Sequence, residues 1–179
     1  MAPAALIQAI QASAPAQWMR TSLAAMPVIE ALHVLAGATV FGTIFIVDLR
    51  LLGFPDTRRP VTKVCREMLR LTWVAFAVSL TCGALMFAAN AQTYVGNTAF
   101  KLKMLALLGA GVNMALFHGI TFRTVGGWDQ NAPTPLAGRI AGATSILLWV
   151  CVIFLARWIG FTKGFDFKVP INPHIDFQF

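Results

Sequence analysis

Four apolar stretches, each long enough to cross a lipid bilayer, constrain this chain more than any other feature. A spanning helix needs about 20 mostly apolar residues, because each residue adds about 1.5 Å against a hydrocarbon core of about 30 Å. Inside a bilayer the backbone must be hydrogen-bonded within the segment, so we expect helices and not strands. The sequence therefore predicts an all-α integral membrane four-helix bundle, with spans at about 27–51, 71–89, 103–122 and 140–161.

The composition agrees with a membrane protein and argues against other classes. Only 12% of the 179 residues are charged, whereas a soluble domain has about a quarter. The net charge of +7 is spread over the ends of the apolar runs and does not form one patch, so we expect no nucleic-acid partner. Three cysteines without metal-ligand spacing argue against a disulfide framework and a structural zinc site.

Basic residues in the short connections predict the orientation of the helices. Arg123 and Arg139 flank the connection between the third and fourth helices. The connection between the first two is richer, with Arg50, Arg58, Arg59, Lys63, Arg66 and Arg70 against Asp56 and Glu67. Because cytoplasmic loops are enriched in Lys and Arg, we expect both connections in the cytoplasm of a bacterium. The chain would then lie in the inner membrane with both termini in the periplasm.

The two ends of the chain are expected to lie outside the bilayer. Residues 1–26 place Leu6, Ile7, Ile10 and Trp18 near helical spacing, which predicts an amphipathic helix on the outer surface, interrupted near Pro15. Residues 162–179 alternate apolar and polar side chains. That pattern fits either an extended, strand-like tail or a partly ordered tail whose aromatic residues enter the interface.

Polar side chains at membrane depth are candidates for function, because placing them in a bilayer is costly. One stripe of the first helix follows spacings of three and four and consists of Glu30, His33, Gly37, Phe41, Ile44 and Asp48. We expect that stripe to face the interior of the bundle. The corresponding stripe of the second helix consists of Thr72, Ala75, Ser79, Gly83, Met86 and Asn90.

By depth, the polar candidates fall into two groups. The outer polar cluster consists of Glu30, His33, Met86, Asn90, Lys103 and Arg157. The inner polar cluster consists of Asp48, Thr72, His118, Thr121 and Ser145. Glu30 and Arg157 lie at matching depth, so an ion pair between them is one hypothesis. The alternative is that Arg157 extends outward to the membrane surface.

His33 is the strongest candidate for a metal or haem ligand. It cannot share one iron with His118, because their depths differ by about 18 Å at about 1.5 Å per residue. A haem b or copper would instead use His33 with Met86, or with His174 of the tail. The competing hypothesis needs no cofactor and has His33 hydrogen-bonded to Glu30 or Asn90 as part of helix packing.

The stretch Val28–Gly53 contains the motifs E-x-x-H-V-L and D-L-R-L-L-G. It resembles an uncharacterised family of small bacterial four-helix inner-membrane proteins. The similarity continues in 94–97, 100–103, Asn113 with Phe117–His118, Trp128–Asp129 and 135–145. This resemblance implies a fold and a membrane location and brings no activity with it. A looser likeness to four-helix cytochrome b and copper-resistance membrane proteins depends on the histidine in the first helix alone.

Three functions are compatible with these features. The leading hypothesis is a non-catalytic inner-membrane subunit or anchor that docks a periplasmic or membrane protein through its N-terminal segment and tail. The second is a redox or metal-handling protein with haem b or copper near His33, for which quinone is a candidate electron-transfer partner. The third is a small proton-coupled transporter using Glu30, His33 and Asp48. It ranks last because the helices lack the Gly/Pro-broken centre common in transporters.

Overall fold

A computed structural model describes residues 3–54, 59–129 and 133–166 of the chain, and this part is helical with no strand. Two short helices come first, α1 (Pro3–Gln11) and α2 (Ala14–Thr21). The long helices are α3 (Ala25–Leu52), α4 (Val61–Ala89), α6 (Thr98–Leu116) and α7 (Leu136–Asp166), with the short α5 (Ala91–Gly96) between α4 and α6. A π-helical turn at Phe117–Thr121 and a 3₁₀ segment at Phe122–Gly127 extend α6.

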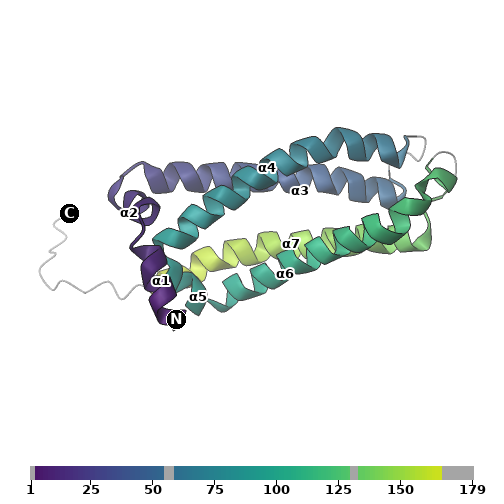
Figure 1. The fold of residues 1–179 in the computed structure, drawn as a ribbon. Coiled ribbons are helices and arrows are strands. Elements are labelled where there is room, and N and C mark those ends of the chain that lie inside the picture. The colour runs from purple at the N-terminus through teal and green to yellow at the C-terminus, as the bar shows by residue number, and fades with distance from the viewer. Residues whose placement is uncertain (1–2, 55–58, 130–132, 167–179) are drawn as a thin grey trace, which may run out of the picture.

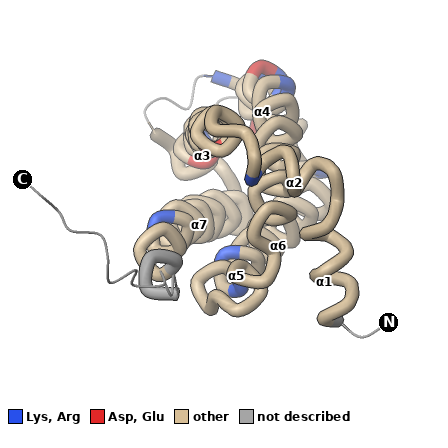
Figure 2. The backbone as a smooth tube through the Cα atoms, turned by 90° about the vertical axis from the view of Figure 1, so that its left-hand side faces the viewer, with Lys and Arg blue, Asp and Glu red and all other residues tan. Residues whose placement is uncertain are grey.

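The long helices form two antiparallel hairpins that lie side by side (Figure 1). The most extensive contact is between α3 and α4, followed by that between α6 and α7, and α3 joins the hairpins by packing on α7. Contact between α4 and α6 is marginal at most. Viewed from the end that carries α1 and α2, the hairpins occupy opposite halves of the bundle (Figure 2). The predicted all-α four-helix architecture is confirmed.

Four helical segments are long and apolar enough to cross a membrane. They are Ala25–Leu52, Val61–Ala89, Thr98–Gly127 and Leu136–Thr162. No more than 22% of the most apolar part of each segment is buried inside the protein. A soluble bundle would leave this much apolar surface in water, whereas lipid covers it at no cost.

The helices extend beyond the predicted spans, and the third begins at Thr98 and not near 103. The second helix begins at residue 61 and not near 71, because the basic stretch 61–70 continues the helix beyond the apolar run. The fourth helix extends to residue 166, so 162–166 belong to it and not to an extended tail. Hydropathy marks where a helix is apolar, whereas the hydrogen-bonded helix continues into its polar ends. The remaining tail, 167–179, lies outside the described residues.

The N-terminal segment packs onto the end of the bundle as two helices, with the break just before Pro15. Met19 of α2 is buried with Ala25 and Ala89. The Arg20 guanidinium donates hydrogen bonds to the carbonyl oxygens of Ala89 (3.0 Å) and Gln11 (2.6 Å). One side chain therefore joins α1 and α2 to the end of α4, where helix carbonyls lack partners of their own.

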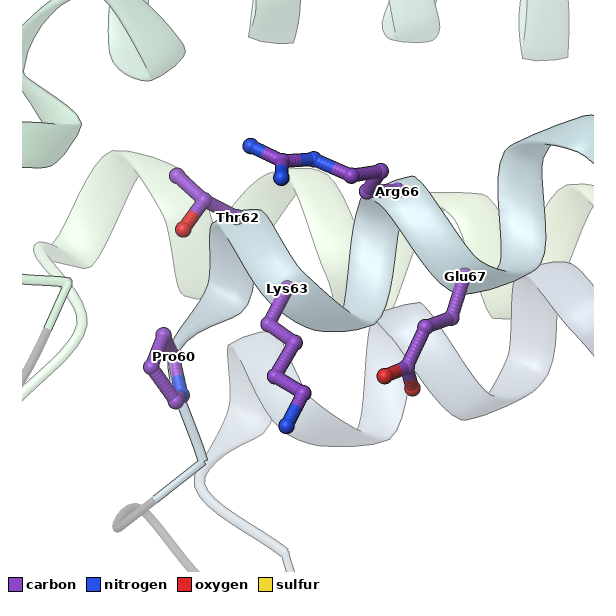
Figure 3. Close-up of a pocket in the computed structure, with 5 residues that line it drawn as sticks. All are labelled: Pro60, Thr62, Lys63, Arg66 and Glu67. Atoms are coloured by element: carbon purple, nitrogen blue, oxygen red, sulfur yellow. The ribbon is translucent and has the colours of Figure 1, made fainter.

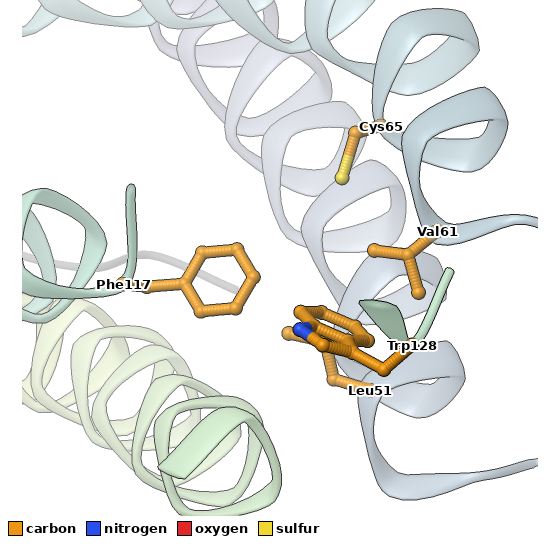
Figure 4. Close-up of a cluster of buried hydrophobic side chains, with 5 residues drawn as sticks. All are labelled: Leu51, Val61, Cys65, Phe117 and Trp128. Carbon is orange, nitrogen blue, oxygen red and sulfur yellow. The ribbon is translucent and has the colours of Figure 1, made fainter. Parts of the chain in front are cut away.

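Buried apolar clusters lie towards both ends of the bundle. At the end with the interhelical connections, Leu51, Val61, Cys65, Phe117 and Trp128 form one cluster (Figure 4). At the opposite end, Tyr94, Ala99 and Ile159 form another, with Phe87 and Phe100 packed against it. These clusters tie the two hairpins together where side chains from α3, α4, α6 and α7 meet.

Glycine permits two features of this architecture. Gly53 ends α3 in the left-handed region, at φ 95°, where a side chain would add strain. Gly142 of α7 lies directly against α3. A Cβ there would be 3.1 Å from the Asp48 carbonyl oxygen and 3.2 Å from Cβ of Leu51. The close approach of α3 and α7 therefore requires a residue without a side chain at this position.

Candidate functional site

His33 lies on the face of α3 that packs against α4, as its stripe predicts. Its Nδ1 is 2.8 Å from the carbonyl oxygen of Ser79 and 3.3 Å from the Ser79 hydroxyl. A carbonyl oxygen can only accept, so Nδ1 carries the proton and donates it. Nε2 is then the unprotonated nitrogen, with a lone pair and no hydrogen bond to any described residue.

The site forms because α4 presents small residues at this level. Ser79 and Gly83 are one helical turn apart, and the imidazole lies against both. A Cβ at Gly83 would be only 3.1 Å from Cε1 of His33 and 3.5 Å from Nδ1. Glycine thus lets the ring approach the α4 backbone closely enough to reach the Ser79 carbonyl.

Two charged residues lie within electrostatic range of His33. Glu30 is one turn earlier on α3, and Lys103 comes from α6 in the other hairpin. Lys103 is half-buried, whereas the nearby Lys101 is exposed. The Glu30 charge also acts on the buried Tyr94 of α5. Burial, together with this negative charge, raises the pKa of the Tyr94 hydroxyl, so it remains neutral.

The other members of the outer polar cluster lie elsewhere. Met86 packs against the cluster of Met19, Ala25 and Ala89, and Asn90 is the residue at which α4 ends. Arg157 is exposed, with its guanidinium 5.0 Å from the centre of the Phe161 ring. Met86 therefore packs against apolar side chains, and no interaction joins it to His33 among the described residues.

The structure does not bring Glu30 and Arg157 together as an ion pair. Both residues are among those described, and both are exposed. Val152 and Ile159 define the buried face of α7. Arg157 is five residues from Val152, so it is turned by about 140° from that face. Matching depth was the basis for the predicted pair, but the two side chains differ in direction around their helices.

Within the inner polar cluster, two pairs meet across helix interfaces. Asp48 of α3, only 5% exposed, forms a hydrogen bond with Ser145 of α7. Its Oδ2 is buried with no hydrogen-bond partner among the described residues. Thr72 of α4 donates to the Thr43 hydroxyl of α3 at 2.8 Å. Thr121 is also buried, beside Gly138.

His118, a member of the inner polar cluster, does not face the interior of the bundle. His118 is exposed, and its Nδ1 lies 3.0 Å from the Met114 carbonyl oxygen of its own helix. It follows the exposed Gly111 and Met114 at helical spacing, whereas the inward-facing row runs through Asn113, Phe117 and Thr121. The polar residue of α6 that does reach α7 is Asn113, which donates to the Ala141 carbonyl at 3.0 Å. His174 lies outside the described residues.

A comparison with protein families identifies the group to which this sequence is related. The model of a family of unknown function, DUF6644, matches residues 16–162, which run from within α2 to within α7 and include α3, α4 and α6 entirely. The chain belongs to this family. No curated protein and no solved structure matches it. The resemblance to an uncharacterised family is thereby confirmed, and DUF6644 membership itself assigns no activity.

This DUF6644 protein has a polar network, not predicted from its sequence, at the end of the bundle where α4 begins. Asp129 accepts hydrogen bonds from the Thr62 backbone at 3.0 Å and the Thr62 hydroxyl at 2.5 Å. Arg50, only 4% exposed, donates from Nε to the Arg59 carbonyl oxygen at 2.6 Å. The sequence placed Arg50 only among the basic residues of the first connection. The partner of its Nε is a backbone carbonyl oxygen, so no sequence motif marks its burial.

Proposed function

We propose that this DUF6644 protein binds haem b in the membrane, with Nε2 of His33 as an axial ligand. The observation that supports this most is the Nδ1–H bond to the Ser79 carbonyl. Haem- and metal-ligating histidines commonly donate the second ring N–H to a carbonyl or carboxylate, which fixes the tautomer and orients the ring. Here the same bond leaves the ligating nitrogen free.

Haem is favoured over a bare copper ion because of the number of available ligands. Among the described residues, no group of three or more His, Cys, Asp and Glu side chains could hold a metal ion. A porphyrin supplies four nitrogens itself, so the protein needs to provide only one or two axial ligands. A single imidazole with a free Nε2 meets that requirement, whereas it would hold a bare ion poorly.

Lys103 supports the same proposal. A haem carries propionate groups, which are negatively charged and are stabilised by a nearby cation. Lys103 brings an ammonium group from α6 into electrostatic range of His33. A haem b at this position would supply one-electron transfer chemistry. The protein would supply the ligand and the propionate partner.

The orientation and location belong to the same proposal. The end of α3, the start of α4 and the start of α7 lie at one end of the bundle, opposite α1, α2 and α5 (Figure 1). That end carries the exposed residues Arg59, Lys63, Arg66, Arg70, Arg123 and Arg139. By the positive-inside rule, this end faces the cytoplasm of a bacterial inner membrane. His33 and α1 are then near the periplasmic side.

The anchor hypothesis has less support. It relies on the N-terminal segment to receive a partner, but α2 packs against α4 of the same chain through Met19, Arg20 and Ala89. A partner could still contact the outer surface of α2, where Trp18 is exposed. The haem proposal depends on a specific atom and is therefore the one to test first.

The direct test is the absorption spectrum of the full chain expressed with sufficient haem supply and purified in mild detergent. The wild type should show a Soret band that shifts on reduction. His33→Ala should lose the band, and His118→Ala should keep it. His118 is the matched control, because its Nδ1 also contacts a carbonyl, yet it is exposed in the π-helical turn after α6. A wild type without haem under these conditions would contradict the proposal.

A further inference from the structure

The first three turns of α4 form a basic surface at the membrane boundary. Helix α4 has 29 residues, a length of about 43 Å at about 1.5 Å per residue, which exceeds a hydrocarbon core of about 30 Å. Its uncharged part, 71–89, spans most of the core. The excess therefore lies at the N-terminal end, in 61–70, where the lipid headgroups are.

Three cations lie at successive depths along this end of the helix. Arg70 is at the edge of the apolar segment. Arg66 and Lys63 are about 6 Å and about 10 Å farther out, at about 1.5 Å per residue. All three side chains are exposed. Spacings of three and four place them on neighbouring rows of one helix face.

A surface depression accompanies these cations. It has a volume of about 400 Å³ and is lined by Pro60, Thr62, Lys63, Arg66 and Glu67 (Figure 3). Glu67 is the acidic member, and no ion pair joins it to Lys63 or Arg66 in the described part of the chain. The ammonium and guanidinium groups therefore retain their donors for another anion.

We propose that this surface binds the phosphate headgroup of an anionic phospholipid. Charge complementarity favours an anion, and the position of 61–70 at the boundary makes a lipid the molecule always present at that depth. Arg66 would donate to phosphate oxygens through its planar guanidinium. In Figure 3 Lys63 extends away from Arg66, so its ammonium group would add attraction for the anion over a longer distance. Thr62 is already held by Asp129 and fixes the start of the helix.

The test compares lipid binding by the full chain in detergent, using native mass spectrometry with phosphatidylglycerol and phosphatidylcholine. The wild type should retain phosphatidylglycerol preferentially. Lys63→Gln/Arg66→Gln should weaken that binding by roughly 30-fold, from about fivefold per cation. The charge-conserving Lys63→Arg/Arg66→Lys should keep most of it. Lys101→Gln/Arg157→Gln is the matched control, because it removes two exposed cations at the opposite end.

Three results would overturn the proposal. The first is equal retention of the two lipids by the wild type. The second is an equal loss in both glutamine variants, which would indicate only general attraction to net positive charge. The third is competition by inorganic phosphate at the same concentration as the lipid, which would assign the site to free phosphate. The lipid preference of the wild type is measured without any substitution, so the proposal stays testable even if a variant misfolds.

Discussion

His33 donates its Nδ1 proton to the carbonyl oxygen of Ser79, 2.8 Å away on the neighbouring helix. In a regular helix the same oxygen also accepts a hydrogen bond from the backbone N–H of Gly83, four residues later. A carbonyl oxygen has two lone pairs, so it can accept both hydrogen bonds. The bond spans α3 and α4, fixes the tautomer of the ring and leaves Nε2 available. Mutations can separate the contribution of this hydrogen bond to helix packing from its contribution to ligand binding.

The approach of His33 depends on Gly83. In Gly83→Val the new side chain would start 3.1 Å from Cε1 of His33, so the ring must move. We expect loss of haem and a decrease in the free energy of unfolding of about 1–3 kcal/mol. Haem content and thermal unfolding in detergent measure the two effects. Gly111→Val is the control, because no atom lies within 4 Å of a Cβ there. Equal losses of haem and of stability in Gly83→Val and Gly111→Val would show that the contact with His33 does not cause them.

The contact between α3 and α7 depends on Gly142. A Cβ at this position would be 3.1 Å from the Asp48 carbonyl oxygen, which belongs to the backbone and cannot swing away. Gly142→Ala should therefore separate the hairpins and lower stability by about 1–3 kcal/mol. Gly119→Ala, on an open face of the π-helical turn, should be nearly neutral. An unchanged unfolding temperature in Gly142→Ala would disprove the close approach of α3 and α7.

Asp129 should stabilise the start of α4 through Thr62. Its carboxylate accepts both the backbone N–H and the hydroxyl of Thr62, as an N-cap residue does for its own helix. Asp129→Ala should cost about 1–2 kcal/mol and accelerate amide exchange in the first turn of α4. Glu67→Ala removes an exposed carboxylate from the same helix and should have little effect. If the amides in the first turn of α4 stay protected from exchange in Asp129→Ala, then Asp129 does not stabilise the start of that helix.

The orientation has its own test. A cysteine introduced at Leu23, which is 98% exposed between α2 and α3, should react with a membrane-impermeant thiol reagent added to intact cells. A cysteine replacing Arg66 should react only after the membrane is opened. The buried Cys65 and Cys82 and the exposed Cys151 are replaced by serine or alanine beforehand. The reverse pattern of labelling would place the connections in the periplasm.

Hydropathy was sufficient to predict the four spans, because about 20 apolar residues in a row have few other uses. Helical spacing also predicted that His33 and Asp48 share the inner face of α3. His118 lies on the exposed row of Gly111 and Met114, next to the buried Phe117, and hydropathy does not distinguish these two rows. The hypothesis of a Glu30–Arg157 pair was based on matching depth, which carries no information on the direction of Arg157 around α7. The Ser79 carbonyl is a backbone atom, so no sequence motif identifies it as the partner of His33.

The central claim is that Nε2 of His33 is an iron ligand, and imidazole rescue of a cavity variant tests it most directly. In His33→Gly the ring is removed, and added imidazole can occupy its place. The account predicts that the purified variant reconstituted with haem lacks the wild-type Soret band and regains it on titration with imidazole, whereas His118→Gly has the wild-type spectrum throughout. A His33→Gly protein that keeps the wild-type spectrum without imidazole would contradict the claim.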